Sequence, residues 1–165
     1  MISHNSIGAL LISLASGCAF AGQTEALEVF SAATCGALTF QGDRMVEDIS
    51  NSFMHFTKSG RAALISELSR VGILTQSVSK SGALSCAVSP QGLTPVGRRV
   101  GDNGLDEFDV KADINLQWSR CDGRACTKFG TPKKAVVTGT VTTLTVNGRP
   151  AYKLSAITFQ EGLTK

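Results

Sequence analysis

The stretch Phe108–Ser119 constrains the fold more than any other part of the sequence. Apolar and polar residues alternate over its whole length without a break, so every second side chain points to the same side of an extended chain. A period of two predicts a β-strand with one buried face, whereas a helix would distribute these apolar residues around its circumference. Long strands that are solvated on one face are typical of antiparallel sheets. The sequence therefore predicts an antiparallel sheet whose apolar face is covered by helices.

Three more segments extend this sheet to about four strands. A short apolar run, Ala83–Ser89, predicts a strand before the long one, and Pro90–Asp106 with its four Gly and two Pro predicts a loop or an irregular hairpin. Ala135–Val146 and Arg149–Gln160 predict two strands that are joined by a type I′ turn at Asn147-Gly148.

The two-residue turn sets the register of this last hairpin. Counting back from it pairs Val146 with Arg149, Thr145 with Pro150, Leu144 with Ala151, Val141 with Leu154 and Gly139 with Ala156. The apolar positions change parity within both strands, which predicts β-bulges or strong bending. A bent sheet of this kind wraps around the helices that cover it.

Three helices are expected before the strands. The first is Thr24–Phe40 with Thr24 as its N-cap, and the second begins at Asp43. The third is Lys58–Ser69 with Thr57 as its N-cap, and Leu64, Ile65, Leu68 and Val71 form its apolar stripe. Helices followed by a strand meander define an α+β fold, with the helices on one face of a curved antiparallel sheet.

The first 21 residues resemble an export signal. They contain no Lys, Arg, Asp or Glu, and the apolar run Ile7–Leu14 precedes the small-residue site Ala19-Phe20-Ala21. Cleavage after Ala21 would leave residues 22–165 as a single domain. Alternatively, the small residues before Cys18 resemble a lipoprotein signal, so that lipidated Cys18 would anchor the chain to a membrane. Retention of the N-terminal segment is a third possibility.

Four cysteines remain after such a signal, and an even number in an oxidising compartment suggests two disulfides with three possible connectivities. Cys121 and Cys126 bracket a short loop after the long strand, so a local bridge between them is natural. Cys35 and Cys86 would then join the first helix to the sheet. Zinc is the alternative, but the C-x4-C spacing is loose and has no partner motif. We therefore expect no metal and no cofactor.

The composition does not favour nucleic-acid binding or catalysis. The net charge is +3, and no dense basic stretch accompanies it. His55 is the one histidine after the expected signal, and it is expected to be partly buried because it lies between Phe53 and Phe56. The carboxylates Asp106, Glu107 and Asp109 mark a solvated strand end or, alternatively, a metal or acid–base site. No known catalytic motif appears, which favours a non-enzymatic protein.

The stretch Phe56-Thr57-Lys58-Ser59-Gly60 and the upstream step Leu38-Thr39-Phe40 resemble the IcmL/DotI family of type IVB secretion and its TraM-like conjugation relatives. In that family an F-T-x-x-G motif opens a helix, so Phe56, Thr57 and Gly60 are the positions that match. The resemblance implies a cystatin-like roll of the nuclear-transport-factor superfold that faces the periplasm.

The same resemblance implies a function without catalysis. It predicts an exported assembly or scaffold subunit whose partners are secretion or conjugation proteins, with a homo-oligomer as a further option. The alternative is a small-ligand binder or an enzyme that uses the cavity often enclosed by this roll. A third alternative is a secreted effector or inhibitor.

Overall fold

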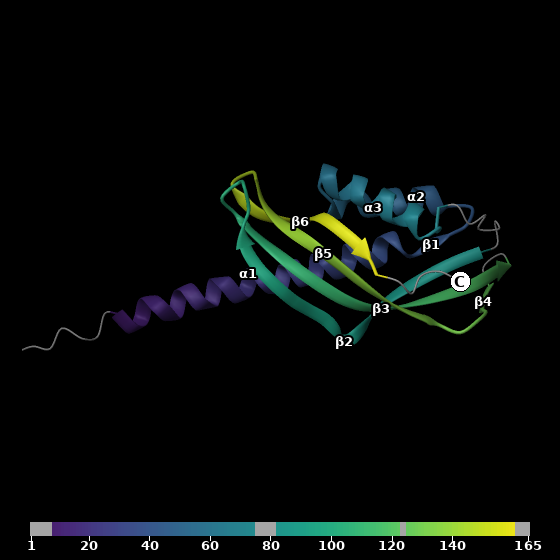
Figure 1. Cartoon of the computed structure of the whole chain (residues 1–165), viewed down its shortest axis with the longest axis horizontal. Coiled ribbons are helices and arrows are strands. Elements are labelled where there is room, and N and C mark those ends of the chain that lie inside the picture. The colour runs from purple at the N-terminus through teal and green to yellow at the C-terminus, as the bar shows by residue number, and fades with distance from the viewer. Residues whose placement is uncertain (1–7, 75–81, 123–124, 161–165) are drawn as a thin grey trace, which may run out of the picture.

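The computed structural model describes residues 8–74, 82–122 and 125–160. The helices are α1 (Gly8–Ala37), α2 (Met45–Ser52), the 3-10 helix η1 (Phe53–His55) and α3 (Lys58–Arg70). The strands are β1 (Phe40–Gln41), β2 (Gly82–Val100), β3 (Asp106–Asp122), β4 (Ala125–Lys128), β5 (Lys133–Val146) and β6 (Arg149–Phe159). They form one antiparallel sheet in the order β1-β2-β3-β5-β6, with β4 paired to β3 (Figure 1). The predicted α+β fold is confirmed, and β1 and β4 are short strands added to the four predicted ones.

The long strand β3 forms the centre of the sheet, as its alternating pattern predicts. Its alternate side chains from Phe108 to Leu116 are buried, and the intervening polar ones face the other side of the sheet. Trp118 is partly buried and packs edge-on against Phe40 of β1, with 6.4 Å between the ring centroids. The strand pairs with β2 along one edge and with β5 and β4 along the other, so it contacts three of the other strands.

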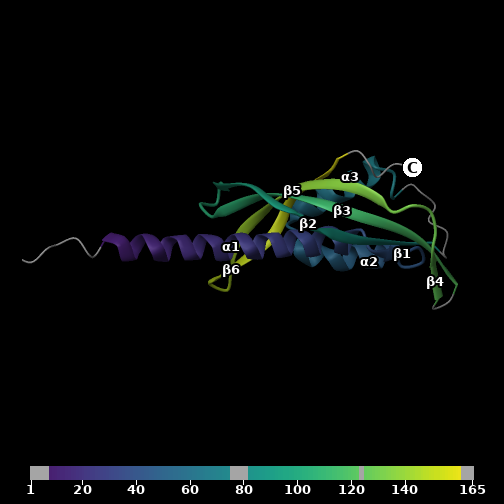
Figure 2. The same ribbon diagram turned by 90° about the horizontal axis from the view of Figure 1, so that it is seen from below.

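The sheet curves around α1. In Figure 2 the β2–β3 turn and the β5–β6 turn lie on opposite sides of this helix, and both figures show the N-terminal part of α1 extending beyond the sheet. Phe30 is fully buried between α1 and β5. A Cβ on Gly139 of β5 would lie 2.8 Å from the Phe30 ring, so the absent side chain at position 139 creates room for that ring. This close packing of a helix onto a strand fixes the position of α1 across the sheet.

The predicted sheet needs two corrections. β2 does not end at Ser89 but continues to Val100, because bulges between Val88 and Leu93 and between Pro95 and Gly97 absorb the prolines and glycines. The predicted pair of Gly139 with Ala156 is also wrong, since Gly139 faces Ile157.

The second correction has its cause in the bulge that the sequence predicts. The other four predicted pairs of the β5–β6 hairpin are confirmed, and the register shifts between Thr140 and Val141. Ser155 is the extra residue in β6 at this point, and its hydroxyl donates to the Thr140 carbonyl oxygen at 3.1 Å. Counting from the turn therefore works up to the bulge and is off by one residue beyond it.

The helix boundaries also differ from the predicted ones. Thr24 does not cap α1, which runs through it from Gly8 to Ala37, because the residues before it, rich in Ala and Leu, are also good helix formers. Asp43 does not open α2, whose N-cap is Arg44 without a side-chain hydrogen bond. Within the described parts of the chain, no helix combines the length and apolarity needed to cross a membrane. Cleavage after Ala21 and lipidation of Cys18 stay predictions from the sequence.

Candidate functional site

The motif residues Phe56, Thr57 and Gly60 attach α3 to the edge of β6. Phe56 is 1% exposed and forms an isolated bridge with Leu154 of β6. The Thr57 hydroxyl oxygen accepts the backbone N–H of Gly60 at 3.0 Å, which makes Thr57 the N-cap of α3 as predicted. The backbone N–H of Thr57 donates to the carbonyl oxygen of Leu154 at 3.0 Å. The motif therefore starts the helix and docks it on the sheet at the same point.

Gly60 is required by the short distance between α3 and β6. A Cβ at this position would lie 2.0 Å from the carbonyl oxygen and 2.9 Å from the carbonyl carbon of Leu154. Both are backbone atoms, so no side-chain rotation relieves the contact. The spacing from Thr57 to Gly60 thus fits a structural requirement of this fold.

The other end of α3 contacts β6 through side chains. The Glu67 carboxylate accepts the backbone N–H of Phe159 at 2.8 Å, and the Arg70 guanidinium donates to the carbonyl oxygen of Phe159. Arg70 also forms an ion pair with Glu67 at 2.7 Å. The hydrogen bond from Arg70 and the one from Phe159 outweigh burial and lower the pKa of Glu67 below its usual range. Helix α3 therefore covers the edge of β6 at both of its ends.

Two disulfides link elements of the sheet to their neighbours. Cys35 near the end of α1 is bonded to Cys86 of β2, across 51 positions of sequence. Cys121 of β3 is bonded to Cys126 of β4, its direct partner in the strand register. These are the two pairs that the sequence analysis favours. The first ties the helical layer to the sheet, and the second holds the short strand β4 in place.

The carboxylates at the start of β3 are paired with two arginines of β2. Asp106 lies 2.8 Å from Arg98, and Glu107 lies 3.0 Å from Arg99, which also contacts Asp109. Of the described residues, no three His, Cys, Asp or Glu side chains are grouped so as to hold a metal ion. The cross-strand pairing of charges is the arrangement that a solvated strand end adopts.

His55 lies in η1 and is half-buried, as its position between two phenylalanines predicts.

The alternative function as a ligand binder or an enzyme requires a cavity on the concave side of the sheet. There α1 contacts β2, β3, β5 and β6, and Ala26, Phe30 and Ala33 of α1 are fully buried. Apolar side chains of the core thus occupy the part of the concave side that these residues of α1 cover.

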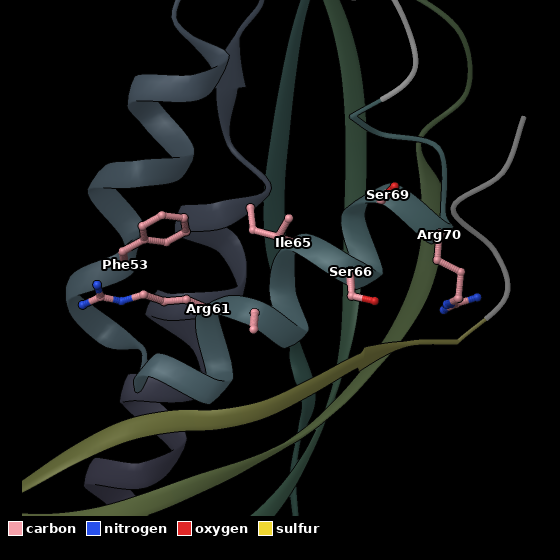
Figure 3. A pocket seen from close by; sticks show the side chains of 7 residues that line it. Phe53, Arg61, Ile65, Ser66, Ser69 and Arg70 are labelled. Carbon is pink, nitrogen blue, oxygen red and sulfur yellow. The ribbon is translucent and has the colours of Figure 1, made fainter.

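A shallow groove lies instead on the outer side of the helical layer, between η1 and α3 (Figure 3). Its volume is about 780 Å³, and its lining residues are Phe53, Arg61, Ala62, Ile65, Ser66, Ser69 and Arg70. The Arg61 guanidinium carbon lies 5.6 Å from the centroid of the Phe53 ring, a cation–π contact (Figure 3). The groove therefore combines an apolar floor with a cation at its rim.

The sequence analysis missed this groove because it placed Ile65 in one apolar stripe of α3 with Leu64, Leu68 and Val71. Leu64, Leu68 and Val71 are buried, whereas Ile65 is 40% exposed. The stripe of spacing i, i+4 that contains Leu64 and Leu68 is complete without Ile65. An apolar residue one position after a buried one belongs to a different face of the helix, and this is the signal that could have indicated the groove.

Comparisons with known proteins identify the fold. No family profile matches the sequence, and no curated protein matches it. A solved periplasmic fragment of TraM superimposes with a TM-score of 0.69 at 14% identity, over 84% of this chain and 96% of the fragment. The periplasmic domain of DotI superimposes with a TM-score of 0.65 at 18% identity, over 81% of this chain and 91% of the domain.

A third solved structure, an IcmL-like type IV secretion system protein from Legionella pneumophila, superimposes with a TM-score of 0.57 at 9% identity, over 84% of this chain and 91% of that protein. All three are proteins with the same α+β roll. The resemblance that the F-T-x-x-G motif indicates is therefore confirmed in the fold of the chain.

Proposed function

We propose that this protein is an exported subunit of a type IV secretion or conjugation apparatus, and that it acts by docking to neighbouring proteins. The observation that carries the proposal is the superposition on 96% of a TraM periplasmic fragment and 91% of the DotI periplasmic domain. A match over nearly the whole of those domains includes the helical layer as well as the sheet.

The surface and the disulfides support a docking role outside the cytoplasm. Disulfides persist in oxidising compartments such as the periplasm, and this chain contains two of them. Buried residues of α1 occupy part of the concave side of the sheet, whereas an apolar groove is open on the outer side of the helices. An exposed apolar groove with a polar rim is typical of a protein interaction site.

Deletion of the gene in its own host tests the proposal. We expect DNA transfer to recipient cells, or secretion of the substrates of the host's type IV system, to fall to background and to be restored by the wild-type gene. A His55→Ala variant should restore it equally well, because the proposed role uses no catalytic histidine. Undiminished transfer and secretion in the deletion strain would refute the proposal.

Export is tested separately on the protein recovered from the periplasm. Cleavage after Ala21 predicts the intact mass of residues 22–165 less four hydrogen atoms, two for each disulfide. A lipidated Cys18 would instead add the mass of the acyl chains, and a retained segment would leave the mass of the whole chain.

A further inference from the structure

We infer that the groove between η1 and α3 binds an amphipathic helix of a partner protein, and that this helix places a carboxylate against Arg61. The inference rests on the proposed function, because it names the kind of partner that the docking subunit contacts. It starts from the contrast between the two faces of α3. Leu64 and Leu68 are fully buried against the protein's own core, whereas Ile65 on the groove side is 40% exposed.

The floor of the groove is apolar and open to solvent. Phe53 and Ile65 supply its large side chains, and Met54, next to Phe53 in η1, is 68% exposed. Transfer of such side chains from water into a protein interface yields about 25 cal/mol for each Å² of buried apolar area. A partner that covers the groove therefore gains free energy from residues that the monomer leaves in water.

Among the arginines of the described helices, Arg61 differs from Arg44 and Arg70. Arg44 forms ion pairs with Glu47 and Asp48, and Arg70 forms one with Glu67. Among the described residues, no carboxylate lies within ion-pair distance of Arg61, whose guanidinium stacks over Phe53. A carboxylate on the partner is the complementary group, and it would find a cation already positioned by the aromatic ring.

The shape of the groove favours a helix over a strand. Ala62, Ile65 and Ser69 follow one another along α3 at spacings of three and four, which covers about 10 Å or two helical turns. A second helix matches this stripe with its own residues at i, i+3, i+4 and i+7. A partner strand would need unpaired backbone N–H and C=O groups on α3 as hydrogen-bond partners. The backbone groups of α3 already bond to one another within the helix. The small side chains Ala62, Ser66 and Ser69 permit the close approach of a helix axis.

The test places a photo-cross-linking amino acid at Ser66 in the full-length protein, expressed in the host that carries the transfer apparatus. The cross-linked peptide is then sequenced by mass spectrometry. We expect one segment of another protein, with apolar residues at helical spacing and an Asp or Glu at the position that faces Arg61. The same amino acid at Lys111, an exposed position on the opposite face of the sheet, serves as the background control.

Two variants establish the chemistry of the contact. Ile65→Asp and Arg61→Glu should each reduce the cross-link yield by about tenfold or more, as expected for a central interface residue. Val96→Asp changes an apolar residue that is 66% exposed on β2, and it should leave the yield unchanged. Exchange of the partner's carboxylate for lysine should restore the yield in the Arg61→Glu protein. Equal circular dichroism spectra confirm that all variants fold.

Several results would overturn the inference. These are a yield at Ser66 no higher than at Lys111, a segment without an acidic residue or helical spacing, cross-links to lipid, or cross-links between two copies of this chain. The transfer assay separates this outcome from a failure of the proposed function. If deletion abolishes transfer but Ile65→Asp and Arg61→Glu both restore it, the groove inference is wrong and the proposed function stands.

Discussion

Substitution of Gly60 by alanine tests the central claim about how the helical layer is attached. The added Cβ would lie 2.0 Å from the Leu154 carbonyl oxygen, well inside van der Waals contact with the backbone of β6. Overpacking of this kind costs about 1–3 kcal/mol, and a contact with backbone places the cost at the upper end. Displacement of α3 also breaks the 3.0 Å hydrogen bond from Thr57 N–H to Leu154, which contributes about 1 kcal/mol.

The higher helix propensity of alanine returns about 1 kcal/mol of this loss. The net destabilisation is therefore about 3 kcal/mol, which corresponds to a decrease in Tm of about 6–12 °C for a chain of this size. Urea denaturation and calorimetry of the disulfide-bonded protein at neutral pH measure both quantities.

Gly36→Ala is the matched control. Its Cβ would make an ordinary 3.5 Å contact with Ser52, and the position lies within α1. This variant gains the same helix propensity without a clash, so we expect its stability to equal or exceed that of the wild type by up to about 1 kcal/mol. Equal stabilities of the Gly60→Ala and Gly36→Ala proteins would refute the claim that α3 packs at Gly60 directly against the backbone of β6.

Three further predictions concern other contacts of the fold. Removal of the Cys35–Cys86 bridge, which closes a loop of 51 positions, should reduce the free energy of unfolding by about 4 kcal/mol, and removal of Cys121–Cys126, with a separation of 5, by about 2 kcal/mol. Equal losses in denaturation experiments on the two double-alanine variants would contradict this loop-length argument. Because the pKa of Glu67 is lowered in the folded state, its stabilisation is present above the ordinary glutamate pKa of about 4.3 and is lost as the pH falls below it. Glu67→Gln should therefore be less stable than the wild type at pH 7 and nearly equal to it at pH 3 in denaturation experiments. Parallel curves of stability against pH for the wild type and Glu67→Gln would contradict this prediction. Gly148→Ala should cost about 1 kcal/mol in thermal unfolding because its φ is +74°, and Gly148→Asn should cost less; a neutral alanine variant would show that the turn adopts another type.

The sequence predicts most of the fold because its strongest signals are local. The alternation of Phe108–Ser119 and the Asn147-Gly148 turn each depend on neighbouring residues, and the structure contains both features as predicted. The N-cap at Thr57 is predicted for the same reason. Local patterns are reliable where the chemistry of a few adjacent residues decides the conformation.

The features that the sequence does not predict depend on tertiary contacts. The continuation of β2 through Pro90 and Pro95 requires β3 as a template, and bulges take up the mismatch. The exposure of Ile65 depends on which side of α3 the sheet covers. The need for glycine at position 60 arises only because the backbone of Leu154 in β6 lies against it. The groove follows from the same docking geometry, so the position of Ile65 next to Leu64 indicates it only once the face of α3 that the sheet covers is known.

The attachment of α3 to β6 has a consequence for the order in which the chain matures. The hydrogen-bonded partners Thr57 and Leu154 are separated by 97 positions, and Glu67 and Phe159 by 92. In the export that we propose, the N-terminus would emerge first, so α3 would be presented long before β6, the strand that covers it. During that interval we expect Leu64 and Leu68, which are buried in the folded protein, to be accessible to chaperones and proteases. A product truncated before Arg149 would keep them uncovered, so these leucines would mark incomplete molecules for degradation.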